Sequence, residues 1–171
     1  MGNTSYYTSG GYDYEKTGSN IQVDFTSTDT ALKTAAEAIH LACTSVKPAG
    51  MSIGKFDIST NANTKFKEYA GEDLADTNDI TLTCAFNLGD YNNIATLIGQ
   101  PLTVTLKFMA CANRKKARQI TYTNAFIMSF EPGDMSANNF PTATMTISTG
   151  GDDHTNADAP APYGTVADMQ A

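Results

Sequence analysis

Few side chains in this 171-residue chain could do acid–base or metal chemistry. Its two histidines are His40 and His154, which leaves general acid–base catalysis by histidine little to work with. His40 lies beside an apolar helical stripe with no partner nearby in sequence, as is typical of a boundary residue rather than a ligand or base. Asp152, Asp153 and His154 are adjacent on a flexible segment and lack the preorganised geometry of a metal site. We therefore expect no bound metal.

Nucleophilic and phosphate-binding motifs are also absent from the sequence. It contains no Gly-x-Ser-x-Gly, no Gly-Lys-Ser/Thr and no His-Glu-x-x-His. Glu72 and Asp73 lie in a polar segment with no sign of burial to raise a pKa, so a glycosidase reading has no support. Cys43, Cys84 and Cys111 are odd in number and widely spaced, which indicates buried, reduced thiols rather than disulfides or zinc ligands. The sequence predicts a protein that is not an enzyme and needs no cofactor.

The charge balance restricts the possible partners. The formal net charge is −7, with 18 acidic and 11 basic side chains, so the overall field repels nucleic acid. An acidic surface could still guide DNA, as a wall along which it slides without being held. No run of 18 apolar residues and no signal peptide is visible, so we expect no membrane association and a chain made in a cytoplasm.

The elements that would position these residues are mainly β-strands. Residues 102–109 alternate apolar and polar side chains, residues 120–130 repeat the pattern, and residues 142–147 form a third such run after the turn Glu131-Pro132-Gly133-Asp134. We predict three consecutive antiparallel strands. Shorter elements are expected before them: strands at 21–25, 53–58 and 80–88, and helices at 30–43 and 91–99.

The composition predicts one mainly β domain with flanking segments. Residues 21–148 would form a β-sandwich or half-barrel with one or two helices, residues 1–20 an N-terminal arm, and residues 149–171 an acidic flexible tail. The predicted N-terminal arm carries four tyrosines: Tyr6, Tyr7, Tyr12 and Tyr14. They indicate either a frayed terminus or a segment that docks on a neighbouring subunit.

Two further segments are candidate interfaces. Residues 59–78 are polar and are expected to form a long loop, whose Phe66, Tyr69 and Leu74 either contact a partner or fold back on the core. The predicted hairpin tip at 113–118 holds four basic residues: Arg114, Lys115, Lys116 and Arg118. Such a run forms a solvated end, a nucleic-acid patch or a surface complementary to an acidic patch on a neighbouring copy.

Six segments occur in a characteristic order: residues 65–71 (Lys-Phe-Lys-Glu-Tyr-Ala-Gly), 80–86 (Ile-Thr-Leu-Thr-Cys-Ala-Phe), 91–99, 102–108, 130–134 (Phe-Glu-Pro-Gly-Asp) and 140–147 (Phe-Pro-Thr-Ala-Thr-Met-Thr-Ile). With these segments, the order of elements resembles the major tail proteins, or tail tube proteins, of tailed bacteriophages.

The resemblance implies a structural virion protein. Six copies would close into a ring with a central β-barrel, and stacked rings would form a hollow tube that conducts phage DNA without binding it specifically. Its partners would be itself and other tail proteins (tape measure, terminator, baseplate or tip), and it would be assembled in the bacterial host cytoplasm and end in the virion tail. The alternative is a β-sandwich binding module, a virion decoration protein or adhesin that recognises glycan or capsid; the lack of Trp weakens it, and eight Tyr residues leave it open.

Overall fold

The computed structural model describes residues 21–108, 118–150 and 164–168, without the side chains of residues 73–75. The described part is mainly β-structure with two short α-helices, in agreement with the predicted fold class. The elements in chain order are β1 (Ile21–Thr26), α1 (Thr30–Glu37), β2 (His40–Lys47), β3 (Met51–Asp57), β4 (Tyr69–Thr77), β5 (Ile80–Ala85), a 3-10 turn (Leu88–Asp90), α2 (Tyr91–Leu97), β6 (Leu102–Phe108), β7 (Arg118–Pro132), β8 (Thr142–Ser148) and β9 (Thr165–Asp168).

Six strands close into an antiparallel barrel. Their order is β6-β1-β2-β5-β8-β7, and β6 pairs again with β7 to complete the circle. The predicted succession of three antiparallel strands is confirmed, because β7 pairs with β6 through its first half and with β8 through its second. Closure pairs one edge of β7 with β6, and at residues 118–121 the other edge of β7 is covered by β9.

The barrel interior follows from the period-two pattern. Ala143, Met145 and Ile147 of β8 are buried, whereas the threonines between them face outward. Ile80 and Leu82 of β5 are buried in the same way. Each large apolar side chain removed from water contributes roughly 1.5–3 kcal/mol, so these alternating residues supply much of the driving force for barrel closure.

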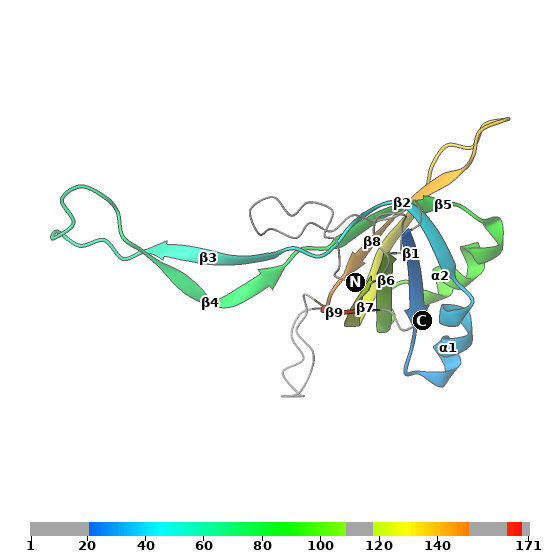
Figure 1. The fold of residues 1–171 in the computed structure, drawn as a ribbon, viewed down its shortest axis with the longest axis horizontal. Helices are drawn as coiled ribbons and strands as arrows, with labels where there is room; N and C mark the ends of the chain where they lie inside the picture. Colours follow the sequence, from blue (N-terminus) through cyan, green and yellow to red (C-terminus); the bar gives the residue numbers. More distant parts are fainter. Residues whose placement is uncertain (1–20, 109–117, 151–163, 169–171) are drawn as a thin grey trace, which may run out of the picture.

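Two helices add to this core. α1 begins after Asp29, whose carboxylate accepts a 2.9 Å hydrogen bond from the Ala31 backbone N–H. α1 buries Ala36, and α2 buries Ile94 and Leu97 within the same apolar cluster. In Figure 1 both helices lie on the side of the barrel away from the long hairpin.

The predicted helix over residues 30–43 was wrong in its second half. α1 ends at Glu37 and β2 begins at His40. Cys43 fits a helical stripe with Ile39 and also a spacing of two with Leu41. In the structure Leu41 and Cys43 both point into the barrel, with Cys43 opposite Cys84 of β5. Pairing between β1, β2 and β5 outweighs the helical preference of this short segment.

The predicted loop at 59–78 was also wrong. β3 and β4 form a separate two-stranded antiparallel sheet, closed by a tip at residues 58–68. Figure 1 shows this hairpin extending far from the barrel as a continuation of β2 and β5. We call the hairpin of β3 and β4 the arm; it is distinct from the predicted N-terminal arm at residues 1–20. The two strand pairs are linked at the joint by a 2.9 Å hydrogen bond from the Asn78 N–H to the Gly50 carbonyl.

Besides β2 and β4, a third strand was not predicted. Thr165–Asp168, inside the expected acidic tail, forms β9 and pairs with the start of β7. In the described part of the chain no helix is long and apolar enough to cross a membrane.

Candidate assembly interface

The arm exposes apolar side chains on both of its faces. Met51 and Ile53 point to one face of β3 and Phe56 to the other, and they are 63, 58 and 51% exposed. All seven residues of β3 are exposed. A two-stranded ribbon is marginally stable in water by itself, and apolar surface of this kind marks a contact site. The arm therefore has the character of a segment that is completed by another surface.

Local contacts hold the ribbon together only weakly. The Lys55 ammonium lies 4.2 Å from the Tyr69 ring centroid, and Lys67 Nζ lies 3.3 Å from the Asp57 carboxylate. Exposed pairs of this type are screened by water and add little to stability. The arm is thus ordered mainly by its backbone ladder and by its attachment to the barrel.

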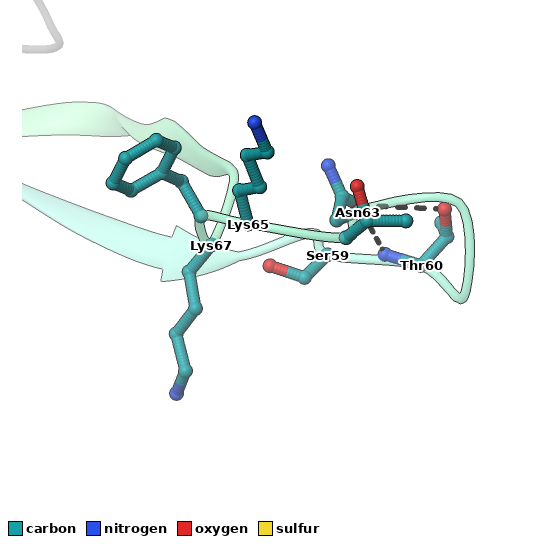
Figure 2. Close-up of a pocket in the computed structure, with 7 residues that line it drawn as sticks. Ser59, Thr60, Asn63, Lys65 and Lys67 are labelled. Atoms are coloured by element: carbon teal, nitrogen blue, oxygen red, sulfur yellow. Dashed lines mark hydrogen bonds between the residues drawn. The ribbon is translucent and has the colours of Figure 1, made fainter.

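The tip of the arm carries two lysines around an exposed aromatic ring. Figure 2 shows Lys65 and Lys67 pointing to opposite sides of the tip, and Phe66 between them in sequence is 85% exposed. A hollow of about 220 Å³ lies beside them, bounded by a turn in which Asn63 Oδ1 accepts a 2.6 Å hydrogen bond from the Thr60 N–H. The hollow is open and polar, and the described residues contain no cluster of three metal-binding side chains.

Buried groups of the barrel fix the base of the arm. The Ala49 N–H donates to the hydroxyl of Tyr122 on β7 at 3.3 Å, and the hydroxyls of Thr77 and Thr149 are 2.7 Å apart. Tyr122 and Thr149 are each 2% exposed. Burial raises the pKa of the Tyr122 phenol above its ordinary value, against a smaller opposing effect of the bond from Ala49. The direction of the arm is therefore set from inside the barrel.

A second apolar surface lies at the other end of the molecule. Phe86 is its centre, with ring centroids 6.4 Å from Tyr91 and 5.7 Å from Phe130. The Phe86 N–H also bonds to the Pro141 carbonyl at 3.1 Å, which ties the β7–β8 turn to this cluster. The exposed apolar side chains around the cluster are Leu88 (73%), Tyr91 (49%), Met135 (55%) and Phe140 (77%). We call this surface the end patch.

A charged group on the barrel wall is internally satisfied. Asp24 accepts hydrogen bonds from Gln22 at 2.8 Å and from Lys107, and pairs with His40 Nδ1 at 2.9 Å. Burial raises the pKa of Asp24, but the bonds from His40, Lys107 and Gln22 outweigh it and hold that pKa below its ordinary value. His40 is thus the partnered boundary residue that the sequence predicted, its partner coming from a neighbouring strand.

The structure places some of the predicted interface residues together and separates others. Phe66 and Tyr69 both lie on the arm, and Leu74 lies in β4, with its side chain outside the description. Arg118 opens β7, where its Nε is 3.4 Å from Asp168 Oδ1 of β9. The remaining predicted residues, Tyr6, Tyr7, Tyr12, Tyr14, Arg114, Lys115 and Lys116, lie outside the described residues.

Sequence reasoning missed the apolar residues of β3 and of the end patch. Ile53 and Phe56 were expected in a strand, but nothing marked that strand as separate from the core. The sequence did contain one sign that this strand is separate from the core: Pro48-Ala49-Gly50 interrupts the apolar run, and in the structure these residues separate the barrel from the arm.

Comparison with known proteins identifies the fold. No protein-family model and no curated protein matches the sequence. Solved structures do match. The anti-feeding prophage baseplate, 6-fold symmetrised, has a TM-score of 0.58 at 9% identity and covers 80% of this chain and 92% of its own. The fold is that of a tail-tube protein.

Two further structures agree. The sheath–tube complex of an extracellular contractile injection system in the extended state has a TM-score of 0.53 at 15% identity, covering 79% of this chain and 87% of its own. The tube-terminating cap of the anti-feeding prophage has a TM-score of 0.54 at 13% identity, covering 86% of this chain and 93% of its own. These neighbours are components of a baseplate, a sheath–tube complex and a tube-terminating cap.

Proposed function

We propose that this chain is the repeating subunit of a hollow tube in a phage tail or a tail-like injection particle. The observation that carries the proposal is an arm with exposed apolar side chains on both faces, held at a defined angle on a barrel of the tail-tube fold. The barrel has an apolar core of its own and can be stable alone, whereas the arm needs a partner. Other copies of the same chain are the simplest such partner.

Six copies per ring follow from the same proposal. The similarity to a 6-fold symmetrised baseplate supports this number. In such a ring each arm reaches beyond its own barrel, and stacking of rings gives the tube. The terminator, cap and baseplate proteins of the particle would then contact the terminal rings, and the subunit would be assembled in the bacterial cytoplasm before reaching the particle.

The cargo of the tube is proposed to be DNA that passes through without being held. The support is the net charge of −7, which disfavours retention of a polyanion. Among the fold neighbours is an extracellular contractile injection system, so a protein cargo is the competing outcome. Particles purified with their contents distinguish the two, because nuclease-protected DNA or protein would be found inside the tube.

Negative-stain electron microscopy of the purified chain tests the proposal. We expect six-fold rings or tubes that become more abundant as the protein concentration rises. A chain that remains monomeric at high concentration and captures soluble glycans would refute the tube and favour the binding module.

A variant of the arm provides the second test. Met51→Ser, Ile53→Ser and Phe56→Ser together should abolish rings and tubes, since these side chains are exposed and outside the barrel core. The far-UV circular dichroism of the barrel should be retained. Normal assembly of this variant would show that the arm is not an intersubunit contact.

A further inference from the structure

The arm tip and the end patch lie at opposite ends of the long axis of the molecule. In Figure 1 the arm extends to one side, while the β7–β8 turn, drawn in yellow and orange, projects on the other side, above the helices. The two surfaces cannot meet within one chain. Any contact between them joins two copies and is heterologous, so it continues from copy to copy and closes into a ring or runs along a stack.

The two surfaces share an apolar, aromatic character. At the tip, Phe66 is an aromatic side chain standing almost fully in solvent. At the end patch, Tyr91 and Phe130 pack against the buried ring of Phe86, and Leu88 and Phe140 in the adjoining segments are exposed. An aromatic side chain seated on a cluster of this kind is a frequent centre of protein–protein contacts.

They are also complementary in charge. Residues 58–68 contain Lys65 and Lys67 against one acid, Glu68, for a net charge of +1. Lys67 also lies 3.3 Å from Asp57 of its own arm, so Lys65 is the tip lysine that faces no acid among the described ion pairs. Residues 86–91 and 130–142 contain Asp90, Glu131 and Asp134 and no lysine or arginine, for a net charge of −3. Lys65 and Lys67 point to opposite sides of the tip (Figure 2), so they can face acids on both sides of a seated Phe66.

We propose that the end patch is the receptor for the arm tip of a neighbouring copy. Phe66 packs against Leu88, Tyr91 and Phe140, and the two lysines pair with acids at the rim. This inference rests on the proposed function and adds which surface of the neighbour each arm engages.

A charge-swap experiment tests the pairing. Lys65→Glu with Lys67→Glu should raise the protein concentration at half-assembly by about tenfold or more, because like charges then face each other and a tenfold change corresponds to only about 1.4 kcal/mol. Glu131→Lys with Asp134→Lys should have the same effect. The quadruple variant restores opposite charges and should return assembly to the wild-type concentration. Mass photometry and negative-stain microscopy measure the concentration at half-assembly for each variant.

The control must change charge without touching either surface. Lys33→Glu serves, because Lys33 lies on α1, where its ammonium is 3.8 Å from Glu37 and is exposed; we expect wild-type assembly. If the wild-type chain never assembles, the proposed function fails. If it assembles and the quadruple variant is no better than either double variant, only the pairing of tip and patch is overturned.

Proximity can be measured independently of charge. Phe66→Cys and Phe140→Cys, placed together in a Cys111→Ser background, should give a ladder of covalent oligomers on mild oxidation, since each chain then offers two linking points. Each single variant should stop at dimers. A double variant that gives no species beyond dimers would contradict the contact.

Discussion

The hydrogen bond between the Tyr122 hydroxyl and the Ala49 N–H links the barrel core to the base of the arm, and its removal has a predictable size. Tyr122→Phe keeps the buried ring and deletes the oxygen that accepts this 3.3 Å bond. A hydrogen bond of this kind contributes about 0.5–1.5 kcal/mol. For a chain of this length, 1 kcal/mol shifts the midpoint by about 2–4 °C, so we expect Tm to fall by roughly that amount at pH 8.

The pH dependence makes this prediction specific. Because burial raises the pKa of Tyr122, the folded chain holds the phenolic proton more tightly than the unfolded chain. The associated stability is complete below the ordinary tyrosine pKa of about 10 and is lost as pH rises through the higher folded value. Phenylalanine has no such proton. The difference in Tm between wild type and variant should therefore shrink above about pH 10.

Thermal unfolding followed by circular dichroism from pH 7 to 11 measures both effects. Tyr91→Phe is the matched control, because that hydroxyl belongs to a half-exposed residue of α2 and the change should leave Tm unaltered. Equal Tm values for wild type and Tyr122→Phe at pH 8, or a difference that does not vary with pH, would refute the reasoning. Tyr122→Phe should also assemble less readily than wild type, because the direction of the arm is then held by fewer contacts.

Three further predictions concern the barrel. Asp24→Asn should cost about 1–3 kcal/mol at neutral pH, and urea titrations should show this loss fading as pH falls through the lowered pKa of Asp24, where the wild type also loses the charge that Lys107 binds; a loss that is constant with pH would contradict this. Ile147→Ala, at a fully buried site of β8, should cost about 2–5 kcal/mol in the same titration, and a cost below 1 kcal/mol would place the residue outside the core. Cys43 and Cys84 are 5% and 0% exposed, so in a Cys111→Ser background burial should keep both from reacting with a thiol reagent at pH 8 until the chain is unfolded, even though their mutual contact raises the pKa of Cys43 and lowers that of Cys84; fast labelling of the folded chain would contradict it.

The alternation of apolar and polar residues predicted the barrel strands β5, β6 and β8 well, but it did not predict the boundary between α1 and β2. The alternation in β5, β6 and β8 is a direct consequence of one face being buried, so period two was sufficient. It could not separate α1 from β2, because Ile39 and Cys43 satisfy a helical stripe while Leu41 and Cys43 satisfy a strand. The outcome there depends on pairing with β1 and β5, which is not a local property.

The candidate interface was predictable only in part, for the same reason. Phe66 and Tyr69 stood out as aromatics in a polar segment, and both lie on the arm. Ile53 and Phe56 looked like ordinary core residues, since a strand that packs on another molecule carries the same pattern as one that packs on its own domain. Which surface a strand faces is decided by the tertiary structure, here by the break at residues 48–50 that directs the chain away from the barrel.

The short joint between barrel and arm has a mechanical consequence. Residues 48–50 on one side and residues 78–79 on the other are all that separate β2 and β5 from β3 and β4. A load applied to the arm therefore reaches the barrel wall directly, because no slack segment lies between them. Bending of the arm would therefore strain the ladder between β2 and β5, so the stiffness of this joint would limit how far the arm could move.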